Sequence, residues 1–430
     1  MLVMNISRRA FLVSAPLLLA ASRANAFTLS AKTGDQTADV QAAIDSAIAR
    51  DGTIVLGPGT FKVKALSVTG NVQIVGTTGQ TILASASDAT LLTISKAGTV
   101  SLSGISFAAK GVAAELVSAS EVARLIVEDC SFAGAGTGLK LQGCGGRIVG
   151  NRFKFHQAAG LFSTDAVGLE ISGNTVSDIG NNGILVWRSD IGEDGTIISN
   201  NHVSRIAAED GGSGQNGNGI NVYRAGNVII ANNRITDCAY SAIRDNSGSD
   251  VVISGNNISR CNEVALYVEF AFQGASVTGN VIEDAGIGIS VTNFDKGGRL
   301  AVVDGNVIRR IKGSSNYGVF YGIGIGVEAD TIVSNNVIEE ASRIGINLGW
   351  GAQGRNLSAL GNVIRKCPTG IATSVVDGFG ETVISANIID GAKTAAIAGF
   401  AWDKAQTGDL AQAGAEVPKM VKLSGNIVRN

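Results

Sequence analysis

Proline and charged side chains are scarce in this sequence. Its 430 residues include four prolines, and 16% of them are Asp, Glu, Lys or Arg, whereas about a quarter is usual for a globular protein. Few prolines leave long stretches free to form backbone hydrogen bonds, and few charges suit a chain whose strand positions mostly face a core. The 57 glycines point to many tight corners.

Further absences exclude several classes of partner. Removing the first 26 residues takes away Arg8, Arg9 and Arg23 and no acid, so the formal net charge goes from −2 to −5. No basic run remains, and we expect no nucleic-acid partner. The apolar run of residues 12–21 is too short to span a membrane, so we expect no stable membrane insertion of the mature chain.

The first 26 residues have the features of an export signal. Arg8 and Arg9 precede Phe11 and the apolar run, and residues 24–26 form a small-x-small cleavage site. Paired arginines followed by Phe-Leu are typical of a twin-arginine signal, with an ordinary signal peptide as the alternative. We therefore expect a periplasmic or secreted protein. Because this route carries folded proteins, it allows a cofactor acquired in the cytoplasm, although no motif supports one.

One short phrase recurs from the middle of the sequence to its end. It consists of an apolar residue, two small or polar residues, an asparagine, any residue and another apolar residue, as in 171–176. Intervals of 23 to 39 residues between the asparagines mark a repeat architecture. The residue before each asparagine is Gly, Asn or Ala, which suits a left-handed corner between two strands. The asparagines are Asn151, Asn174, Asn201, Asn233, Asn256, Asn280, Asn306, Asn336, Asn362, Asn387 and Asn426.

A second phrase in each repeat alternates between two faces, as in Gly183 to Val186 and Gly219 to Val222. A period of two is typical of strands, and no part of the repeat region reads as a long amphipathic helix. One repeat therefore forms one coil, and asparagines of successive coils can bond to one another in a ladder. These patterns predict an all-β fold, a single parallel β-helix.

The pattern divides the chain into three parts. Residues 1–26 are the signal, 27–60 form an N-terminal cap with a helix over 37–50 and a first strand, and 61–430 form the β-helix. An insertion loop over 401–420 interrupts the last coils. The apolar face of the helix can cover the open edge of the first coil.

Three of the five cysteines, Cys238, Cys261 and Cys367, stand five residues after a repeat asparagine. Other repeats have Ile or Ala at this position, which favours an interior column of small apolar side chains. Cys238 and Cys261 lie one coil apart, so a disulfide between them is geometrically possible. No C-x-x-C spacing exists, and we expect no metal or cofactor bound by these residues.

The stretch from Gly34 to Phe61 is similar to the N-terminal segment of pectate-lyase-like right-handed parallel β-helix proteins. The signal combined with asparagine repeats resembles a bacterial family of twin-arginine-translocated β-helix repeat proteins of uncharacterised activity. The resemblance implies a right-handed coil. Members of the wider superfamily cleave or epimerise acidic polysaccharides, but their Gly-His-Gly, Asn-Thr-Asp and Asp-Pro-His-Asp motifs do not occur in this sequence. The fold therefore implies no particular reaction.

If the alternating strands stack in register, their outward residues form a strip of aromatic, amide and charged side chains. We expect such a strip to bind a polysaccharide, because rings stack on the C–H faces of sugars and polar groups bond hydroxyls and carboxylates. A solvated face with scattered aromatic residues is the alternative. The candidate binding residues are Trp187, Arg188, Asn221, Tyr223, Arg224 and Glu328.

Asp245 occupies an inward position where other coils have Val or Leu. An unpartnered carboxylate is costly there, so either the strand turns outward early or Asp245 has a partner and a raised pKa. Local rules tend to fail at functional sites, which makes Asp245 the first candidate for an acid or base. We expect Arg244 to bind a carboxylate or stabilise an enolate-like intermediate, Tyr267 to transfer a proton, and Glu269 to be the second carboxylate of a hydrolysis.

Two acidic loops, residues 190–195 and 207–219, are expected to bulge from the same side. Their carboxylates could cover the groove or hold Ca²⁺; no other metal or cofactor is expected. The sequence leaves open whether the protein is an enzyme. The alternatives are a lyase, hydrolase or epimerase of an acidic polysaccharide, and a non-catalytic glycan-binding or structural scaffold in the periplasm.

Overall fold

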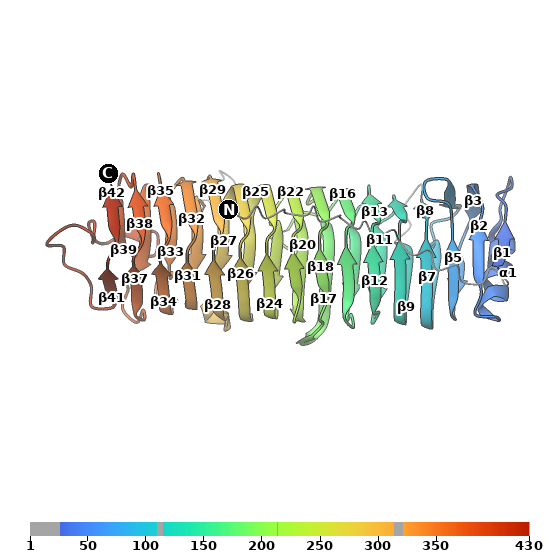
Figure 1. Cartoon of the computed structure of the whole chain (residues 1–430), viewed down its shortest axis with the longest axis horizontal. Coiled ribbons are helices and arrows are strands. Elements are labelled where there is room, and N and C mark those ends of the chain that lie inside the picture. The colour runs from blue at the N-terminus through green and yellow to red at the C-terminus, as the bar shows by residue number, and fades with distance from the viewer. Residues whose placement is uncertain (1–25, 110–114, 213, 314–320, 430) are drawn as a thin grey trace, which may run out of the picture.

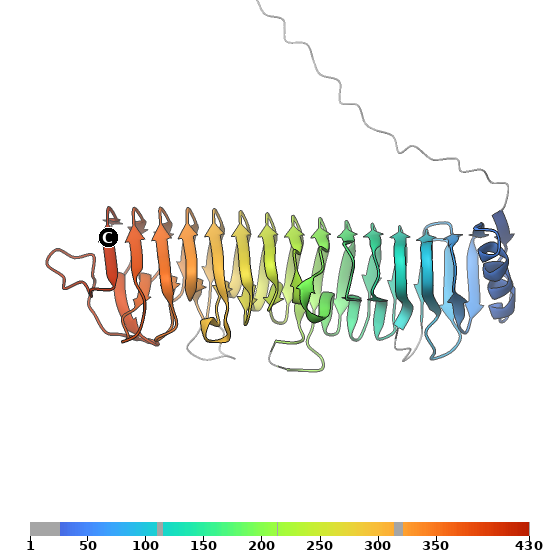
Figure 2. The same cartoon turned by 90° about the horizontal axis from the view of Figure 1, so that it is seen from below.

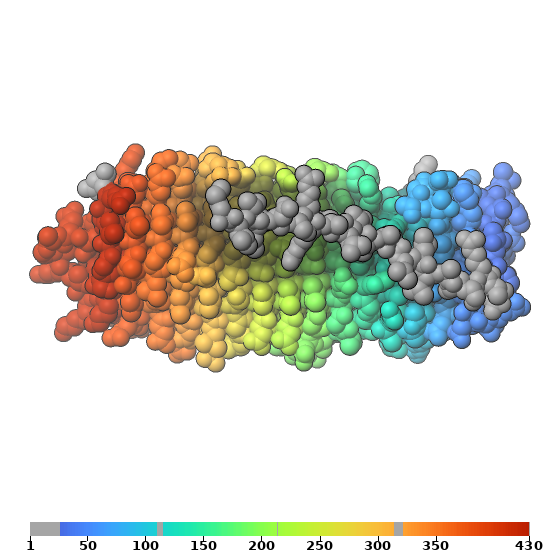
Figure 3. Space-filling model, in the orientation of Figure 1, coloured from blue at the N-terminus to red at the C-terminus, as the bar shows by residue number. Residues whose placement is uncertain are grey.

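A straight stack of coils makes up the protein. The computed structural model describes residues 26–109, 115–212, 214–313 and 321–429. They form a right-handed parallel β-helix of about 14 turns, seen as a row of coils in Figure 1 and as successive colour bands along a rod in Figure 3. The predicted fold class is confirmed. Residues 1–25 of the predicted signal lie outside the described residues.

Each regular coil contributes strands to three stacks, which we call the first, second and third sheets. The first sheet precedes the repeat asparagine, the second follows it, and the third contains the alternating phrase. Equivalent strands pair in parallel, so that Val176, Val203 and Ile235 lie directly above one another. In Figure 2 the corners along one edge of the stack are short and uniform, whereas connections on the opposite edge protrude to different lengths.

The first sheet, joined at its start by β1 (Ala26–Leu29), consists of β2 (Thr53–Leu56), β5 (Val72–Val75), β7 (Leu92–Ser103), β9 (Glu115–Glu128), β12 (Gly146–Val149), β15 (Leu169–Ser172), β18 (Ile197–Ser199), β21 (Ile229–Ala231), β24 (Ser249–Ser254), β26 (Gln273–Thr278), β28 (Arg299–Asp304), β31 (Ala329–Ser334), β34 (Arg355–Leu360), β37 (Thr382–Ser385) and β41 (Val421–Ser424). The second sheet consists of β3 (Gly59–Val63), β6 (Thr81–Ser85), β8 (Ile105–Ala108), β10 (Ser131–Ala133), β13 (Arg152–Lys154), β16 (Thr175–Ile179), β19 (His202–Ile206), β22 (Arg234–Cys238), β25 (Asn257–Glu269), β27 (Val281–Val291), β29 (Val307–Ile311), β32 (Val337–Ala341), β35 (Val363–Arg365), β38 (Ile388–Asp390) and β42 (Ile427–Arg429). The third sheet consists of β4 (Leu66–Val68), β11 (Thr137–Gln142), β14 (Ala159–Thr164), β17 (Asn182–Glu193), β20 (Asn218–Gly226), β23 (Ile243–Asn246), β30 (Ile323–Val327), β33 (Ile344–Leu348), β36 (Thr369–Ser374) and β39 (Ala395–Ala401), together with the first parts of β7 and β9 and the last parts of β25 and β27.

The repeat asparagines form a continuous ladder. In each step, the backbone N–H and the side-chain Nδ2 of one asparagine both donate to Oδ1 of the next, as Asn174 does to Asn201 at 2.9 and 3.0 Å. Nδ2 also donates to a carbonyl oxygen of the preceding coil, for Asn174 that of Ile148 at 2.8 Å. The residue before each ladder asparagine has φ between 53° and 71°, the left-handed corner that Gly and Asn adopt most easily.

Helix α1 (Thr37–Ile48) covers the N-terminal end of the stack. It buries Val40, Ala43, Ile44 and Ala47, and it packs on β1, β2, β4 and β5. The helix ends two residues before the predicted 37–50. It shields apolar side chains of the first coil that no preceding coil covers.

The excursion of residues 401–420 covers the last strand of the third sheet. Strand β40 (Lys404–Ala405) pairs antiparallel with β39. The carboxylate of Asp409 accepts hydrogen bonds from the backbone N–H groups of Ala396 and Ile397 at 2.9 and 3.1 Å, and Leu410 is buried in the core. The excursion therefore acts as a C-terminal cap, because it pairs backbone groups that the next coil would otherwise bond.

The cysteines lie in the interior. Cys238 and Cys261 are paired in register on β22 and β25, and both are buried free thiols, so the possible disulfide is not formed. Cys367 is also buried and free, and burial raises the pKa of its thiol to about 11. These residues pack as small apolar side chains.

Replacing Asn233 with Ala is expected to reduce the free energy of unfolding by about 2 to 4 kcal/mol. The substitution removes four side-chain hydrogen bonds, two accepted from Asn201 and one each donated to Ile198 and Asn256. Urea denaturation measures the loss. Asn426→Ala at the half-exposed end of the ladder is the control, and it should cost about 1 kcal/mol because water can replace its partners. Equal losses at the two positions would contradict the cooperative ladder.

Candidate functional site

The outward residues of the third sheet stack in register. One column is Leu185, Asn221, Arg244, Tyr267, Ser290, Gly326 and Asn347. A second column, two residues further along each strand, is Trp187, Tyr223, Asn246 and Glu269. We call these columns, together with Thr292, Glu328 and Trp350 that follow strands of the same sheet, the outer strip. It spans six strand spacings between β17 and β33, about 29 Å at roughly 4.8 Å each.

The N-terminal end of the outer strip is an aromatic ledge formed by Phe162, Trp187 and Tyr223. The ring centroids of Phe162 and Trp187 are 5.0 Å apart, and those of Trp187 and Tyr223 are 5.6 Å apart, both edge to face. The guanidinium carbon of Arg224 lies 4.8 Å from the Tyr223 ring centroid, and its Nη1 donates to the carbonyl oxygen of Ser189 at 2.8 Å. These contacts fix the rings against the sheet, so they present a rigid surface.

Arg188 lies beside the aromatic ledge, in the part of β17 where the register with β20 shifts after Trp187. Its side chain is half-buried, and its buried Nε has no hydrogen-bond partner among the described residues. The same holds for Nη1 of Arg244, so each of these two arginines keeps one buried donor without a partner in the described part of the chain.

Arg244 and Glu269 form a buried ion pair in the middle of the strip. Nε of Arg244 donates to Oε1 of Glu269 at 2.6 Å, and Asn246 donates to the same oxygen at 3.1 Å. The side chains are 11% and 2% exposed, and burial raises the pKa of Glu269. The charge of Arg244 is thus compensated within the protein rather than offered to a ligand.

Tyr267 connects this ion pair to the C-terminal part of the strip. The Arg244 guanidinium carbon lies 5.3 Å from the centroid of its ring. Burial raises the pKa of the Tyr267 phenol well above its usual range. The phenol is therefore protonated at neutral pH and can donate a hydrogen bond to a ligand.

Asp245 faces the interior of the coil rather than the outer strip. It is paired in register with Val222 and Val268 and is completely buried, so the strand does not turn outward early. Neither carboxyl oxygen has a hydrogen-bond partner among the described residues, and burial raises its pKa to about 8. The expected raised pKa is present without the expected partner. In this position the carboxyl group does not reach the surface on which a ligand would lie.

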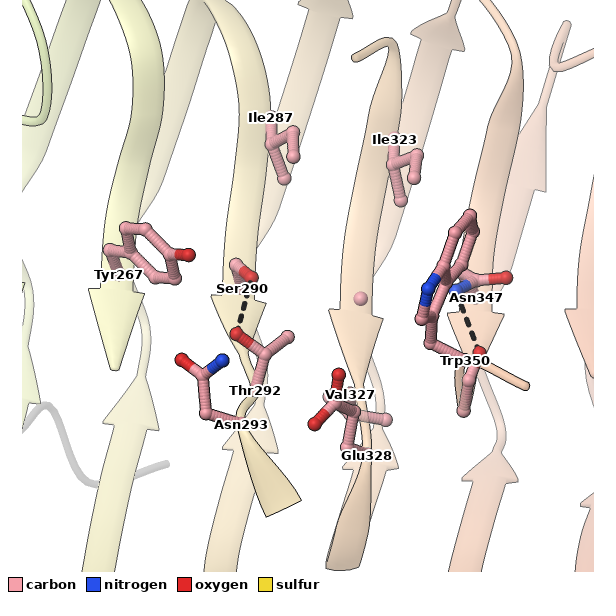
Figure 4. A pocket seen from close by; sticks show the side chains of 12 residues that line it. Tyr267, Ile287, Ser290, Thr292, Asn293, Ile323, Val327, Glu328, Asn347 and Trp350 are labelled. Carbon is pink, nitrogen blue, oxygen red and sulfur yellow. Dashed lines mark hydrogen bonds between the residues drawn. The ribbon is translucent and has the colours of Figure 1, made fainter. Parts of the chain in front are cut away.

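A pocket of about 350 Å³ opens at the C-terminal end of the outer strip, across β25, β27, β30 and β33 (Figure 4). Figure 4 shows Tyr267 at one end and Trp350 at the other, with the Glu328 carboxylate between them. Its other lining residues are Ile287, Ser290, Thr292, Asn293, Ile323, Gly326, Val327, Asn347 and Gly349.

The hollow lies where Gly326 interrupts the outward column. A Cβ atom built on this glycine would meet only the Ile323 Cγ2 atom, at 3.9 Å, and its φ is not in the left-handed region. Glycine is therefore not required by the backbone here. The missing side chain between Ser290 and Asn347 leaves room for a ligand.

Glu328 places a carboxyl group inside this pocket. Its Oε2 accepts a hydrogen bond from the backbone N–H of Phe294 at 2.6 Å. Burial raises its pKa to about 7, and the nearby Asp295 acts in the same direction. A carboxyl group that titrates near neutral pH in a pocket is suited to proton transfer.

The sequence did not single out Asn293, Asn347 or Trp350 as site residues. Asn347 Nδ2 donates to the carbonyl oxygen of Gly349 at 3.1 Å, and the ring of Trp350 lies edge to face with that of Trp402 in the C-terminal cap, 6.0 Å between centroids. Asn347 stands in an alternating phrase and was detectable by extending the strip by one coil. Trp350 owes its place to a turn after β33, which period-two alternation does not predict.

The two acidic loops do not build a metal site in the described residues. Asp194 is buried and accepts a hydrogen bond from Thr196, and Asp210 accepts one from Asn181 at 2.8 Å. In the described ranges, no group of three His, Cys, Asp or Glu side chains is arranged to hold a metal ion. Those residues also contain no helix long and apolar enough to cross a membrane.

Comparison with known proteins agrees with the fold. The family model described as right handed beta helix region matches residues 67–203 and 190–322, which together cover more than half of the chain. No curated protein matches the sequence.

Three solved structures are similar over most of this chain. A PL6 alginate lyase in complex with a trisaccharide shares 13% identity over 96% of this chain and 97% of its own, with a TM-score of 0.52. DFA-IIIase from Arthrobacter chlorophenolicus A6, without its lid, shares 13% identity over 78% and 94%, with a TM-score of 0.51. GH136 lacto-N-biosidase from Eubacterium ramulus shares 12% identity over 73% and 68%, with a TM-score of 0.51. At these identities the likeness concerns the fold alone.

Replacing Asp245 with Val is expected to stabilise the protein by an amount that grows with pH. The pKa of Asp245 is raised in the folded state, so ionisation costs stability as pH rises from about 4, the unfolded value, to about 8. The advantage of the variant should be small below pH 4, reach several kcal/mol near pH 8, and then stay constant. Urea denaturation across this range measures it. If the free energy of unfolding changed with pH in the same way for the wild type and the variant, Asp245 would not be buried as described.

Proposed function

This chain belongs to the right-handed β-helix family, and from that premise we propose that it binds a polysaccharide along the outer strip. The observation that carries the proposal is the continuity of the strip, in which the aromatic ledge leads in register to the pocket. Aromatic rings suit the C–H faces of sugars, and the hydroxyl, amide and carboxyl groups of the pocket suit their hydroxyls. One sugar unit occupies the pocket between Tyr267 and Trp350.

The structural neighbours support a saccharide ligand. One is an alginate lyase solved with a trisaccharide, and another is a lacto-N-biosidase. The same fold therefore serves proteins that act on saccharides. Because fold does not imply function, the proposal depends on the outer strip of this chain.

The proposal includes export to the periplasm by the twin-arginine route, as in the bacterial repeat family that the sequence resembles. Arg8, Arg9 and the apolar run that follows them support it. An extracytoplasmic location suits a polymeric ligand, and a surface 29 Å long, by the estimate of roughly 4.8 Å per strand, suits several sugar units in a row.

Replacing Gly326 with Leu is expected to weaken polysaccharide binding at least about tenfold. The new side chain fills the pocket, while the free energy of unfolding should change by no more than about 0.5 kcal/mol because the Cβ atom meets Ile323 Cγ2 only at an ordinary contact distance of 3.9 Å. Affinity electrophoresis on a panel of soluble polysaccharides measures binding. Ser358→Leu, on the outward face of the first sheet, is the control. Unchanged binding by the Gly326 variant would mean that the pocket holds no part of the ligand.

Cleavage of the bound chain is a second candidate function, favoured by Glu328. In its protonated form this residue can donate a proton to a leaving glycosidic oxygen. Tyr267 can hydrogen-bond the same sugar unit, while Arg244, one strand away and paired with Glu269, packs on the Tyr267 ring. Asp245 takes no part in this scheme because its carboxyl group lies inside the coil. Without cleavage, the protein is a glycan-binding module or scaffold.

Replacing Glu328 with Gln is expected to abolish turnover while affinity stays within about tenfold, since shape is kept and proton transfer is lost. In the wild type, the rate should fall as pH rises through about 7, because burial raises the pKa of Glu328 to that value. New reducing ends without unsaturated products indicate hydrolysis, and unsaturated products absorbing in the ultraviolet indicate a lyase. Glu381→Gln, an exposed acid on another face, is the control. If no product forms but Gly326→Leu weakens binding, the protein is a binding module.

A further inference from the structure

The pocket offers no positive charge to a ligand. Among its described lining residues there is no lysine, arginine or histidine, and Glu328 is the one that carries a charge. Residues 314–320, which lie outside the described part, contain no charged side chain in the sequence. A ligand in this pocket therefore meets hydroxyls, amides, apolar walls and one acid.

Cations near the pocket are already compensated. Arg244, one strand beyond Tyr267, is paired with Glu269. Lys296 is paired with Asp295 at 3.1 Å, and Arg355 is paired with Asp330 at 3.1 Å. Glu328 has no ion-pair partner among the described residues that line the pocket, so the potential inside the pocket is negative.

The arginines of the aromatic ledge are too far away to change this. Arg224 is on β20, and Glu328 follows β30, four strand spacings further along the third sheet. At roughly 4.8 Å per strand this is about 19 Å. The separation exceeds the screening length of about 10 Å at 0.1 M salt. The charge of the ledge therefore does not reach a ligand in the pocket.

We propose that the pocket receives a neutral sugar unit and that Glu328 is the residue that excludes a uronate from it. This inference rests on the proposed function and refines it by naming the class of sugar. It departs from the acidic polysaccharide that the sequence led us to expect, because that expectation counted Arg244 as free to bind a carboxylate.

The chemistry of the two sugar classes explains the selection. An ionised carboxylate is a hydrogen-bond acceptor only, and the hydroxyls of a neutral sugar can donate to Glu328. The carboxylate of a uronate cannot donate, and it would bring a second negative charge into a half-enclosed site, where like charges repel strongly. Trp350, Ile287 and Ile323 provide the apolar surface for the C–H groups of the ring.

The exclusion depends on pH. Glu328 faces the backbone N–H groups of Phe294 and Asn293, and Asp295 is the charged group that acts on it. Among the described lining residues, Tyr267 is the other titratable side chain, and it is protonated at neutral pH. Burial raises the pKa of Glu328 to about 7, so discrimination should be strong above that pH and should weaken below it, where a protonated Glu328 can donate to a carboxylate.

Matched polymers test the inference. The probes are polygalacturonate, polyguluronate, polymannuronate and hyaluronan, each compared with its carboxyl-reduced form, in which the uronate becomes a neutral hexose. For at least one pair, wild-type protein at pH 8 is expected to bind the reduced form at least about tenfold more tightly, as measured by isothermal titration calorimetry. Lowering the pH to 5.5 should narrow this difference.

Variants locate the effect. At pH 8, Glu328→Gln should reduce the difference in affinity between each uronate polymer and its reduced form. Glu381→Gln should leave this difference unchanged. Gly326→Leu should weaken binding of the reduced forms, which places the neutral unit in the pocket. Circular dichroism shows whether each variant is folded.

Two results would overturn the inference while leaving the proposed function intact. One is that every uronate polymer of the panel that binds wild-type protein at pH 8 binds as tightly as its reduced form. The other is a preference for the reduced form that persists unchanged in Glu328→Gln. If none of these polymers, nor any neutral glucan, mannan or fructan, binds in either form, the proposed function itself fails and the inference falls with it.

Discussion

The register of the asparagine ladder is the constraint on which the rest of the structure depends. Each ladder asparagine bonds to the next at a fixed corner, so every coil starts its second sheet at the same height above the last. Inward residues then pair with the residues at the equivalent positions of the next coils, as Val203, Ile235 and Ile258 do. A slip of one residue would turn every side chain to the opposite face, and the buried amides would lose their partners. The register of the ladder therefore determines both the stability of the fold and the geometry of the site.

This constraint explains how a surface can be assembled from residues far apart in the sequence. Trp187 and Tyr223 are neighbours because they hold the same position in consecutive coils, and so are Asn246 and Glu269. A column can also have a gap, and Gly326 makes one without any strained backbone. The solenoid thus makes a pocket by omitting one side chain from an otherwise continuous row, while the stacked backbones beside it stay in place.

Charge is distributed unevenly along the outer strip. Arg188 and Arg224 lie at the aromatic ledge, and Arg244 forms an ion pair with Glu269. Glu328 lies in the pocket, whose described lining residues include no cation. Asp245 has no such surface role, because its inward position leaves it between valines. Two carboxyl groups with pKa values raised by burial thus have different consequences. Glu328 faces a cavity and can meet a ligand, whereas Asp245 imposes a pH-dependent cost on the fold.

The sequence by itself determined the coil, because its signals are local and repeated. The asparagine, the left-handed residue before it and the alternating phrase each act within a few residues, so the ladder, the inward columns and the in-register strip could be predicted from the letters. The inward position of Asp245 also followed from alternation. Only the tertiary structure decided which outward residues work together. The pairing of Arg244 with Glu269, the pocket opened at Gly326, and the approach of Trp350 to it depend on side-chain conformations, turns and burial across coils, and no local pattern encodes these.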